Sequence, residues 1–121
     1  MKTTLTTILA SAFMITLASG LQAQIKKVMV NSVDINAIKE VHYVQLLGVL
    51  ENKKMIIEVD YGQQLSDKDQ VITSADGKPH HFESMVDALN FMYENGWEFL
   101  NAYEIKSADG DIYHFLLKKK E

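Results

Sequence analysis

The side chains with the widest chemical repertoire in this chain are its four histidines: His42, His80, His81 and His114. Imidazole nitrogens bind zinc, most often together with other histidines or a carboxylate. A helix that begins at Phe82 and packs near the last strand would bring His81 towards His114. Asp76 or Glu83 would then complete a site of two histidines and one carboxylate.

The spacing of these histidines matches none of the established metal motifs. The sequence contains no His-x-His, His-Glu-x-x-His or cysteine-based pattern. His80 and His81 are adjacent, so only one of the two rings points easily at a given centre in an extended chain. We therefore expect no metal site and no cofactor. The alternative is a small-ligand or metal-binding domain that uses the loop around His80 and His81.

Motifs of catalytic chemistry are also missing from the sequence. Asp109-Gly110-Asp111 has the start of a calcium loop but lacks its further acidic positions, so it is better explained as a turn. No serine lies in a nucleophile elbow, and no glycine-rich phosphate loop follows a strand. No pair of carboxylates stands out for sugar hydrolysis. We expect a protein that is not an enzyme and has no catalytic residues.

The first residues are typical of a secretory signal peptide. Lys2 supplies the positive start, Leu5 to Leu17 is mostly apolar, and small residues follow up to Ala23. The apolar run is shorter than the roughly 20 residues that span a bilayer, so a retained membrane anchor is the less favoured alternative. We expect residues 1–23 to be removed by cleavage after Ala23, or after Gly20 as second choice. No membrane span would then remain.

The composition indicates one acidic domain held together by an ordinary hydrophobic core. There is no cysteine, hence no disulfide and no lipid anchor through a terminal cysteine, and cleavage leaves about 98 of the 121 residues. Disulfide-free export favours a bacterial envelope protein. The formal net charge is −4, and every basic side chain is a lysine. Because contacts to bases and phosphates favour arginine, we expect no nucleic-acid partner.

Two segments in the first half alternate like β-strands. Val41 to Leu50 and Met55 to Tyr61 are rich in β-branched and apolar residues, and Glu51 to Lys54 forms the loop of a predicted hairpin. Gly48 marks a bulge or a close approach within the first strand. The following segment, Gly62 to His81, is polar and long for a compact domain. It is therefore expected to be functional or mobile.

The period becomes helical from Phe82 onwards. The apolar residues follow the i, i+3, i+4 pattern: Phe82, Met85, Val86, Leu89, Met92 and Tyr93. Asn95 ends the predicted helix, and Gly96 follows in the left-handed conformation that glycine adopts cheaply. Trp97 would then pack back onto Met92. We interpret Met92, Gly96 and Trp97 as a structural corner rather than a ligand platform.

A second predicted hairpin follows this corner and turns at Asp109-Gly110. Its expected inner face is formed by alternate residues of both strands: Trp97, Phe99, Tyr103 and Ile105, then Tyr113, Phe115 and Leu117. The predicted fold class is α+β. A four-stranded antiparallel sheet in the order β-β-α-β-β has one amphipathic helix packed on one face. The domain is residues 40–121, preceded by an N-terminal segment at 24–39.

The face of the sheet away from the helix is predicted to be unusually apolar. A solvated face of an antiparallel sheet should be polar, whereas this one would expose a candidate interface: Val44, Leu46, Ile56, Leu100, Ile112 and Leu116. Such a patch usually marks an interaction surface. The segment 24–39 could instead fold over it. We expect self-association, as a homo-oligomer, or binding to an envelope protein partner.

The residues around the corner resemble the small bacterial "GWE" domains of unknown function. The pattern combines a tyrosine-bearing first strand, a helix ending in glycine, Trp-Glu-apolar, and a final Tyr-x-Phe-x-x-Lys strand. The residues that match it are Tyr43, Leu89, Gly96, Trp97, Glu98, Phe99, Tyr113, Phe115 and Lys118. The run MVDALNFMYENGWEFLNAY also resembles small exported proteins of Gram-negative anaerobes. The resemblance implies this fold and a periplasmic or extracellular location, and it implies no activity.

Overall fold

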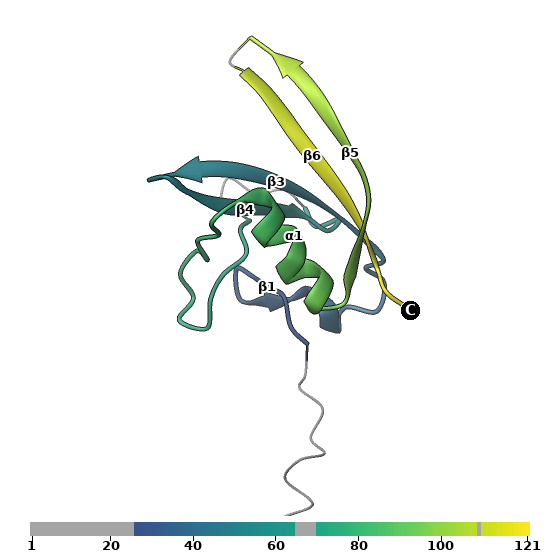
Figure 1. Cartoon of the computed structure of the whole chain (residues 1–121). Coiled ribbons are helices and arrows are strands. Elements are labelled where there is room, and N and C mark those ends of the chain that lie inside the picture. The colour runs from purple at the N-terminus through teal and green to yellow at the C-terminus, as the bar shows by residue number, and fades with distance from the viewer. Residues whose placement is uncertain (1–25, 65–69, 109) are drawn as a thin grey trace, which may run out of the picture.

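The structure, a computed structural model, describes residues 26–64, 70–108 and 110–121 (Figure 1). The predicted signal peptide at 1–23 lies outside the described residues. The described part is mostly β, with a four-stranded antiparallel sheet, a two-stranded sheet and one α-helix. This agrees with the predicted α+β class. None of its helices is long and apolar enough to cross a membrane.

The four-stranded sheet consists of β3 (Tyr43–Glu51), β4 (Lys54–Asp60), β5 (Trp97–Ser107) and β6 (Gly110–Lys119). The strand order is β4-β3-β6-β5, and all neighbours are antiparallel. The hairpins β3–β4 and β5–β6 are each formed by strands that are neighbours in the chain, and pairing of β3 with β6 joins them into one sheet. β5 is one edge strand of this sheet and β4 is the other.

The whole chain does not match the predicted β-β-α-β-β order, because further elements precede β3. These are β1 (Met29–Val30), β2 (Val33–Asp34) and the 3-10 helix η1 (Ile35–Ala37). Three of the fully buried core residues lie in this stretch: Val28, Val30 and Ile35. The N-terminal segment thus belongs to the same core as the sheet. In Figure 1 it lies beside α1, so it does not cover the opposite face.

The β3–β4 loop is shorter than predicted. Only Asn52 and Lys53 lie between the paired residues Glu51 and Lys54, and both have positive φ angles, of 51° and 67°. This is the two-residue turn whose twist matches that of the flanking strands.

The helix α1 (Met85–Glu94) begins later than the apolar pattern predicted. The Ser84 hydroxyl accepts a hydrogen bond from the Asp87 backbone N–H at 3.1 Å, and Asp87 Oδ2 accepts one from the Glu83 N–H at 3.0 Å. This reciprocal cap fixes the start of the helix. Phe82 therefore lies outside α1, where it is buried and bridges to Met55 of β4.

Residues of the predicted loop cover the outer edge of β4. Glu58 and Met55 form isolated bridges with Val71 and Phe82, and the Ile72 N–H donates to the Ile57 carbonyl at 2.9 Å. The 62–81 segment, apart from residues 65–69, which are not described, is thus part of the fold around the sheet. Among the described residues, no strand pairs with the outer edge of β5.

A β-bulge at Leu100 changes which side chains of β5 face α1. Phe99 pairs with Leu117 and Asn101 with Leu116, so Leu100 is an extra residue. Beyond the bulge the side chains are displaced by one position relative to simple alternation. The expectation that Trp97, Phe99, Tyr103 and Ile105 share one face is therefore wrong. Trp97 and Phe99 face the helix side, whereas Tyr103 and Ile105 face the opposite side.

Candidate functional site

The main exposed apolar surface lies on the far part of the β5–β6 hairpin. We call the hairpin from Phe99 to Phe115 the arm; in Figure 1 its far end extends away from α1. More than half of the exposed large apolar side chains of the described residues lie on it: Phe99, Leu100, Tyr103, Ile105, Ile112 and Tyr113. Their exposed fractions range from 38% to 54%. An apolar concentration of this kind in a small domain is typical of an interaction surface.

The structure divides the six predicted interface residues into three pairs, of which two lie outside the core face of the sheet. Leu100 and Ile112 are exposed on the arm. Leu116 is half-buried and Ile56 is 9% exposed, both on the side of the sheet away from α1.

Val44 and Leu46 do not lie on the open face, contrary to expectation. They are 1% and 0% exposed and belong to the core, where they pair with Leu117 and Phe115. Gly48, two residues further along the same face, shows why. A Cβ atom at Gly48 would lie 3.1 Å from the Met85 sulfur of α1. This face of β3 therefore points to the helix.

Sequence reasoning assigned four exposed residues of the arm to the covered face, namely Phe99, Tyr103, Ile105 and Tyr113, and two of them, Tyr103 and Ile105, lie on the opposite face. Tyr103 and Ile105 are separated from Trp97 and Phe99 by even numbers of residues, and simple alternation therefore assigned them to the covered face. Only the bulge at Leu100 moves them to the open face, and no turn or glycine signal in the sequence marks that bulge. The face on which Tyr103 and Ile105 lie therefore could not be identified from alternation alone.

An ordered row of side chains crosses the open face at the base of the arm. The Tyr103 and His114 rings are stacked, with centroids 5.0 Å apart and an interplanar angle of 6°. His114 Nδ1 also shares a hydrogen bond with Nε2 of Gln45 on β3. The row joins β3, β6 and β5 and holds Tyr103 in place. Such preorganised aromatic side chains lose little entropy when a partner binds.

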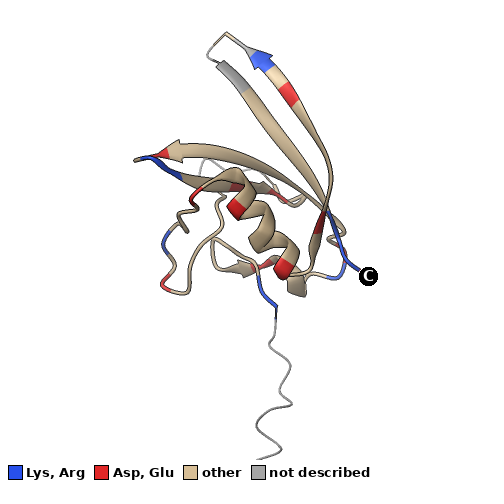
Figure 2. Cartoon of the chain, in the orientation of Figure 1, with Lys and Arg blue, Asp and Glu red and all other residues tan. Residues whose placement is uncertain are grey.

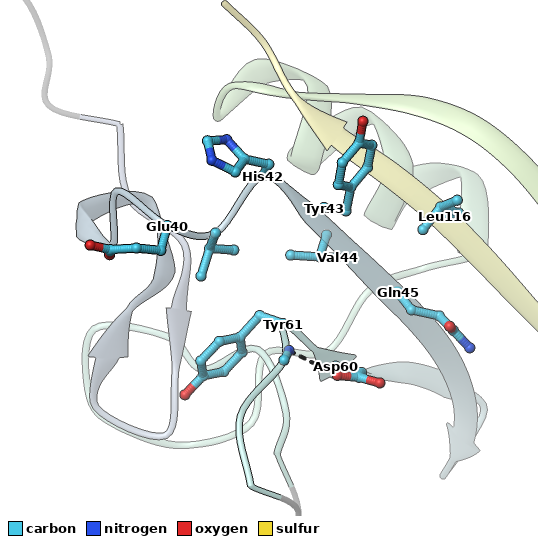
Figure 3. A pocket seen from close by; sticks show the side chains of 10 residues that line it. Glu40, His42, Tyr43, Val44, Gln45, Asp60, Tyr61 and Leu116 are labelled. Carbon is cyan, nitrogen blue, oxygen red and sulfur yellow. Dashed lines mark hydrogen bonds between the residues drawn. The ribbon is translucent and has the colours of Figure 1, made fainter.

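A hollow of about 330 Å³, lined in part by Val41, Val44 and Leu116, lies where β3 begins and β4 ends (Figure 3). Polar and aromatic side chains line it: Glu40, His42, Tyr43, Gln45, Asp60 and Tyr61. Its volume is at the low end of the roughly 300–1,000 Å³ of ligand pockets. Tyr43 is 53% exposed, and His42 and Asp60 are also exposed. Solvent therefore reaches these groups.

A second hollow, of about 220 Å³, separates the arm from the β3–β4 hairpin and α1. Most of the residues that line it are apolar, and they include two methionines: Gly48, Met55, Met85, Ile112, Tyr113 and Phe115. It is smaller than typical small-molecule pockets, and one wall consists of the exposed Ile112 and Tyr113. The apolar surface of the arm thus continues around its edge into this hollow.

The histidine loop is arranged differently from a metal site. His80 packs against Phe82, with ring centroids 4.4 Å apart, and its Nδ1 shares a hydrogen bond with Ser74 Oγ at 2.9 Å. His81 is exposed beside it. His114 lies on β6, occupied by its stack with Tyr103. Within the described part of the chain, no three His, Cys, Asp or Glu side chains gather where they could hold a metal ion.

The C-terminal lysines Lys119 and Lys120 make contacts with the rest of the domain. Lys119 Nζ donates to the Ile38 carbonyl at 3.0 Å and lies 5.4 Å from the centre of the Trp97 ring. Lys120 Nζ donates to the Tyr93 carbonyl at 2.8 Å and lies over the Tyr93 ring. Both ammonium groups therefore hold the end of β6 against the helix-to-strand corner.

The corner itself is structural, as its sequence indicated. Gly96 has a φ of +97°, and Met92 and Trp97 are fully buried in the core. The Trp97 indole N–H donates to Asn36 Oδ1 at 2.7 Å, and the fully buried ring has no face left for a ligand.

Comparisons with protein-family models, curated proteins and solved structures find no match for this chain. The resemblance to the "GWE" domains therefore stays a prediction.

Proposed function

We propose that this chain is a non-enzymatic, exported protein of the Gram-negative envelope that binds a protein partner through the arm. The observation that carries the proposal is the set of six exposed apolar side chains on one hairpin. In an isolated molecule these side chains would remain in water, although a partner surface could bury them. Burial of apolar area contributes roughly 25 cal/mol per Å² before the costs of association are subtracted.

A protein partner accounts for this surface better than a small molecule does. The arm is a two-stranded ribbon whose exposed side chains lie along its length, whereas small ligands are enclosed in concave pockets. The neighbouring hollow, at about 220 Å³, is too small to enclose most cofactors. Aromatic and aliphatic anchors such as Tyr103 and Ile105 are the residue types that dominate protein interfaces.

Site-specific photo-crosslinking in intact cells tests the proposal. A photoreactive amino acid at Ile105 is expected to give a discrete covalent adduct of the mature chain in the envelope fraction. Lys78, which is exposed in the 74–78 turn, is the control position and is expected to give none. The reason is that more than half of the exposed large apolar side chains of the described residues lie on the arm.

Two results would contradict the proposal. The first is equal labelling at Ile105 and Lys78, and the second is no adduct at Ile105, Tyr103 or Ile112. The adduct mass also shows whether the partner is the same chain or another protein. A chain found only in the cytoplasmic fraction would contradict the proposed location without deciding the binding surface.

A further inference from the structure

We infer that the partner of the arm presents a basic amphipathic helix, which packs between α1 and the side of the arm that faces α1. The inference rests on the proposed function, because it assigns the chemistry of one segment of that partner. An amphipathic helix that lays its apolar side chains along an apolar surface is a recurring mode of protein recognition.

The contacts of α1 show which of its flanks faces the arm. Phe91 packs against Phe82 beside β4, with ring centroids 5.4 Å apart. Met85 instead lines the hollow of about 220 Å³ together with Tyr113 and Phe115 of the arm. Because successive residues of a helix turn by about 100°, Met85 and Phe91 are about 120° apart around its axis. The flank of α1 beyond Met85 therefore faces the arm.

Two large side chains on this flank extend into solvent. Val86 and Tyr93 are seven positions apart, so they form one line along α1, about 80–100° from Met85 and about 140–160° from Phe91. Val86 is 63% exposed and Tyr93 is 60% exposed. The residues that face solvent on a surface helix are typically polar. This apolar line beside the arm is thus left without a partner in the isolated domain.

Phe99 and Tyr113 form the side of the arm opposite this line. Phe99 pairs with the core residue Leu117, and Tyr113 lies on the same face, two positions from Phe115. Phe99 is 51% exposed and Tyr113 is 54% exposed, whereas no other large apolar side chain described on the arm exceeds 47%. We call these four residues the helix-side strip: Val86, Tyr93, Phe99 and Tyr113.

The hollow offers a place for one anchor side chain of the bound helix. Met55 and Met85 lie at its floor, where a Cβ atom at Gly48 would lie 3.1 Å from the Met85 sulfur. Glycine at this position therefore keeps the hollow open. Thioether side chains are flexible and adapt to apolar groups of different shape. The strip and the hollow together suit a segment with several apolar side chains on one side.

The charges of α1 favour a basic partner. The helix contains Asp87 and Glu94, both exposed, and no basic residue (Figure 2). Neither carboxylate forms an ion pair within the part of the chain that the structure describes. Glu94 is the last residue of α1, where the helix dipole favours a cation. Lys120 Nζ bonds the Tyr93 carbonyl and lies over the Tyr93 ring, not at the Glu94 carboxylate.

The acidic and apolar lines of α1 have the same spacing. Asp87 and Glu94 are seven positions apart, as Val86 and Tyr93 are, and the two lines run side by side along the helix. A partner helix that repeats apolar and basic residues every seven positions matches both lines at once. The partner chemistry that fits is therefore leucine-like anchors with lysine or arginine beside them.

Binding of designed peptides, measured by fluorescence anisotropy, tests the inference. Two peptides of about 18 residues, long enough for a helix in water, carry the same line of leucines. One places lysines beside the leucines and the other places glutamates there. The purified mature chain is expected to bind the lysine peptide with a Kd below about 100 μM, and the glutamate peptide at least about tenfold more weakly at low salt.

Variants of the chain assign the binding to the helix-side strip. Val86→Ser and Tyr113→Ser each remove one exposed apolar side chain, from α1 and from the arm respectively. Glu94→Lys reverses one charge beside the strip. Each of the three is expected to raise the Kd of the lysine peptide by at least about fivefold. Ile105→Ser, on the open face, and Glu51→Lys, at the exposed end of β3, are the controls and should leave it within about twofold.

Four results would overturn the inference. They are no binding of the lysine peptide up to about 1 mM, equal binding of both peptides, a Kd that the two controls raise as much as Val86→Ser and Glu94→Lys do, and a Kd that Tyr113→Ser leaves unchanged. An adduct at Ile105 in cells would still support the proposed function in each case, and its absence would contradict that function even if the peptide binds. Circular dichroism and melting of each variant establish that the fold is retained.

Discussion

Gly96 is the single residue on which the helix-to-strand corner depends. Its φ of +97° lies in the region that side chains with a Cβ avoid, and a Cβ at this position would meet nothing within 4 Å. The cost of a substitution is therefore conformational and involves no clash. We expect Gly96→Ala to lower the free energy of unfolding by about 1–2 kcal/mol, measured by urea denaturation.

Asparagine supplies the control for this prediction, because its short polar side chain tolerates the left-handed region better than alanine does. Gly96→Asn should therefore lose clearly less stability than Gly96→Ala. If both variants unfold at the same urea concentration as the original chain, the positive φ does not stabilise the corner.

The sequence predicted the residues of the corner itself, but it did not predict their distant contacts. Gly96 and Trp97 were identified correctly, because a helix end needs a left-handed residue and glycine provides it locally. The partner of the indole was not identified. Asn36 lies 61 residues earlier, and its side chain also donates to the Asn95 carbonyl at 2.8 Å. No local pattern relates residues so far apart in the chain.

Among the elements, the sequence predicts where strands lie better than it predicts which way they face. β4 alternates clearly, and Ile57 and Val59 are buried as expected. β3 is apolar on both faces, so its register was ambiguous, and Val44 and Leu46 were assigned to the wrong side. β5 alternates clearly too, but the bulge at Leu100 breaks its parity. A one-residue shift reverses every assignment that follows.

The bulge leads to a prediction about deletions at the element scale. Removal of Leu100 leaves the existing pairs Phe99–Leu117 and Asn101–Leu116 adjacent on both strands, so the ladder becomes regular. We expect the deletion to preserve the fold and to change the melting temperature by only a few degrees. The stacked Tyr103 and His114 rings should remain, which the ring-current shifts of the His114 protons in NMR spectra report.

Deletion of Leu116, across the ladder, is the matched control. It would leave two extra residues on β5 and remove a half-buried side chain, at a cost of about 2 kcal/mol or more. If the Leu100 deletion destabilises the chain as much as the Leu116 deletion does, the extra residue of β5 is required for the fold and is no simple insertion.

At the scale of the whole molecule, the N-terminal segment is built into the core of the α+β domain. Ile35 is fully buried with Val28 and Val30, and Asn36 ties the segment to the corner beside Trp97. The segment and the sheet should therefore unfold together in one cooperative transition. A segment lying loosely over the sheet would instead detach first, at lower denaturant concentration than the sheet itself.

Substitutions within this segment distinguish the two cases. We expect Ile35→Ala to lower the free energy of unfolding by about 2–5 kcal/mol, as Ile57→Ala in the sheet should, because each leaves a cavity in the same core. Val33→Ala, at an exposed position of β2, should change it by less than about 0.5 kcal/mol. Trp97 fluorescence and far-ultraviolet circular dichroism should shift to the same lower midpoint in Ile35→Ala. A shift in fluorescence alone would mean that the segment and the sheet unfold separately, and it would move the boundary of the domain back to the start of β3.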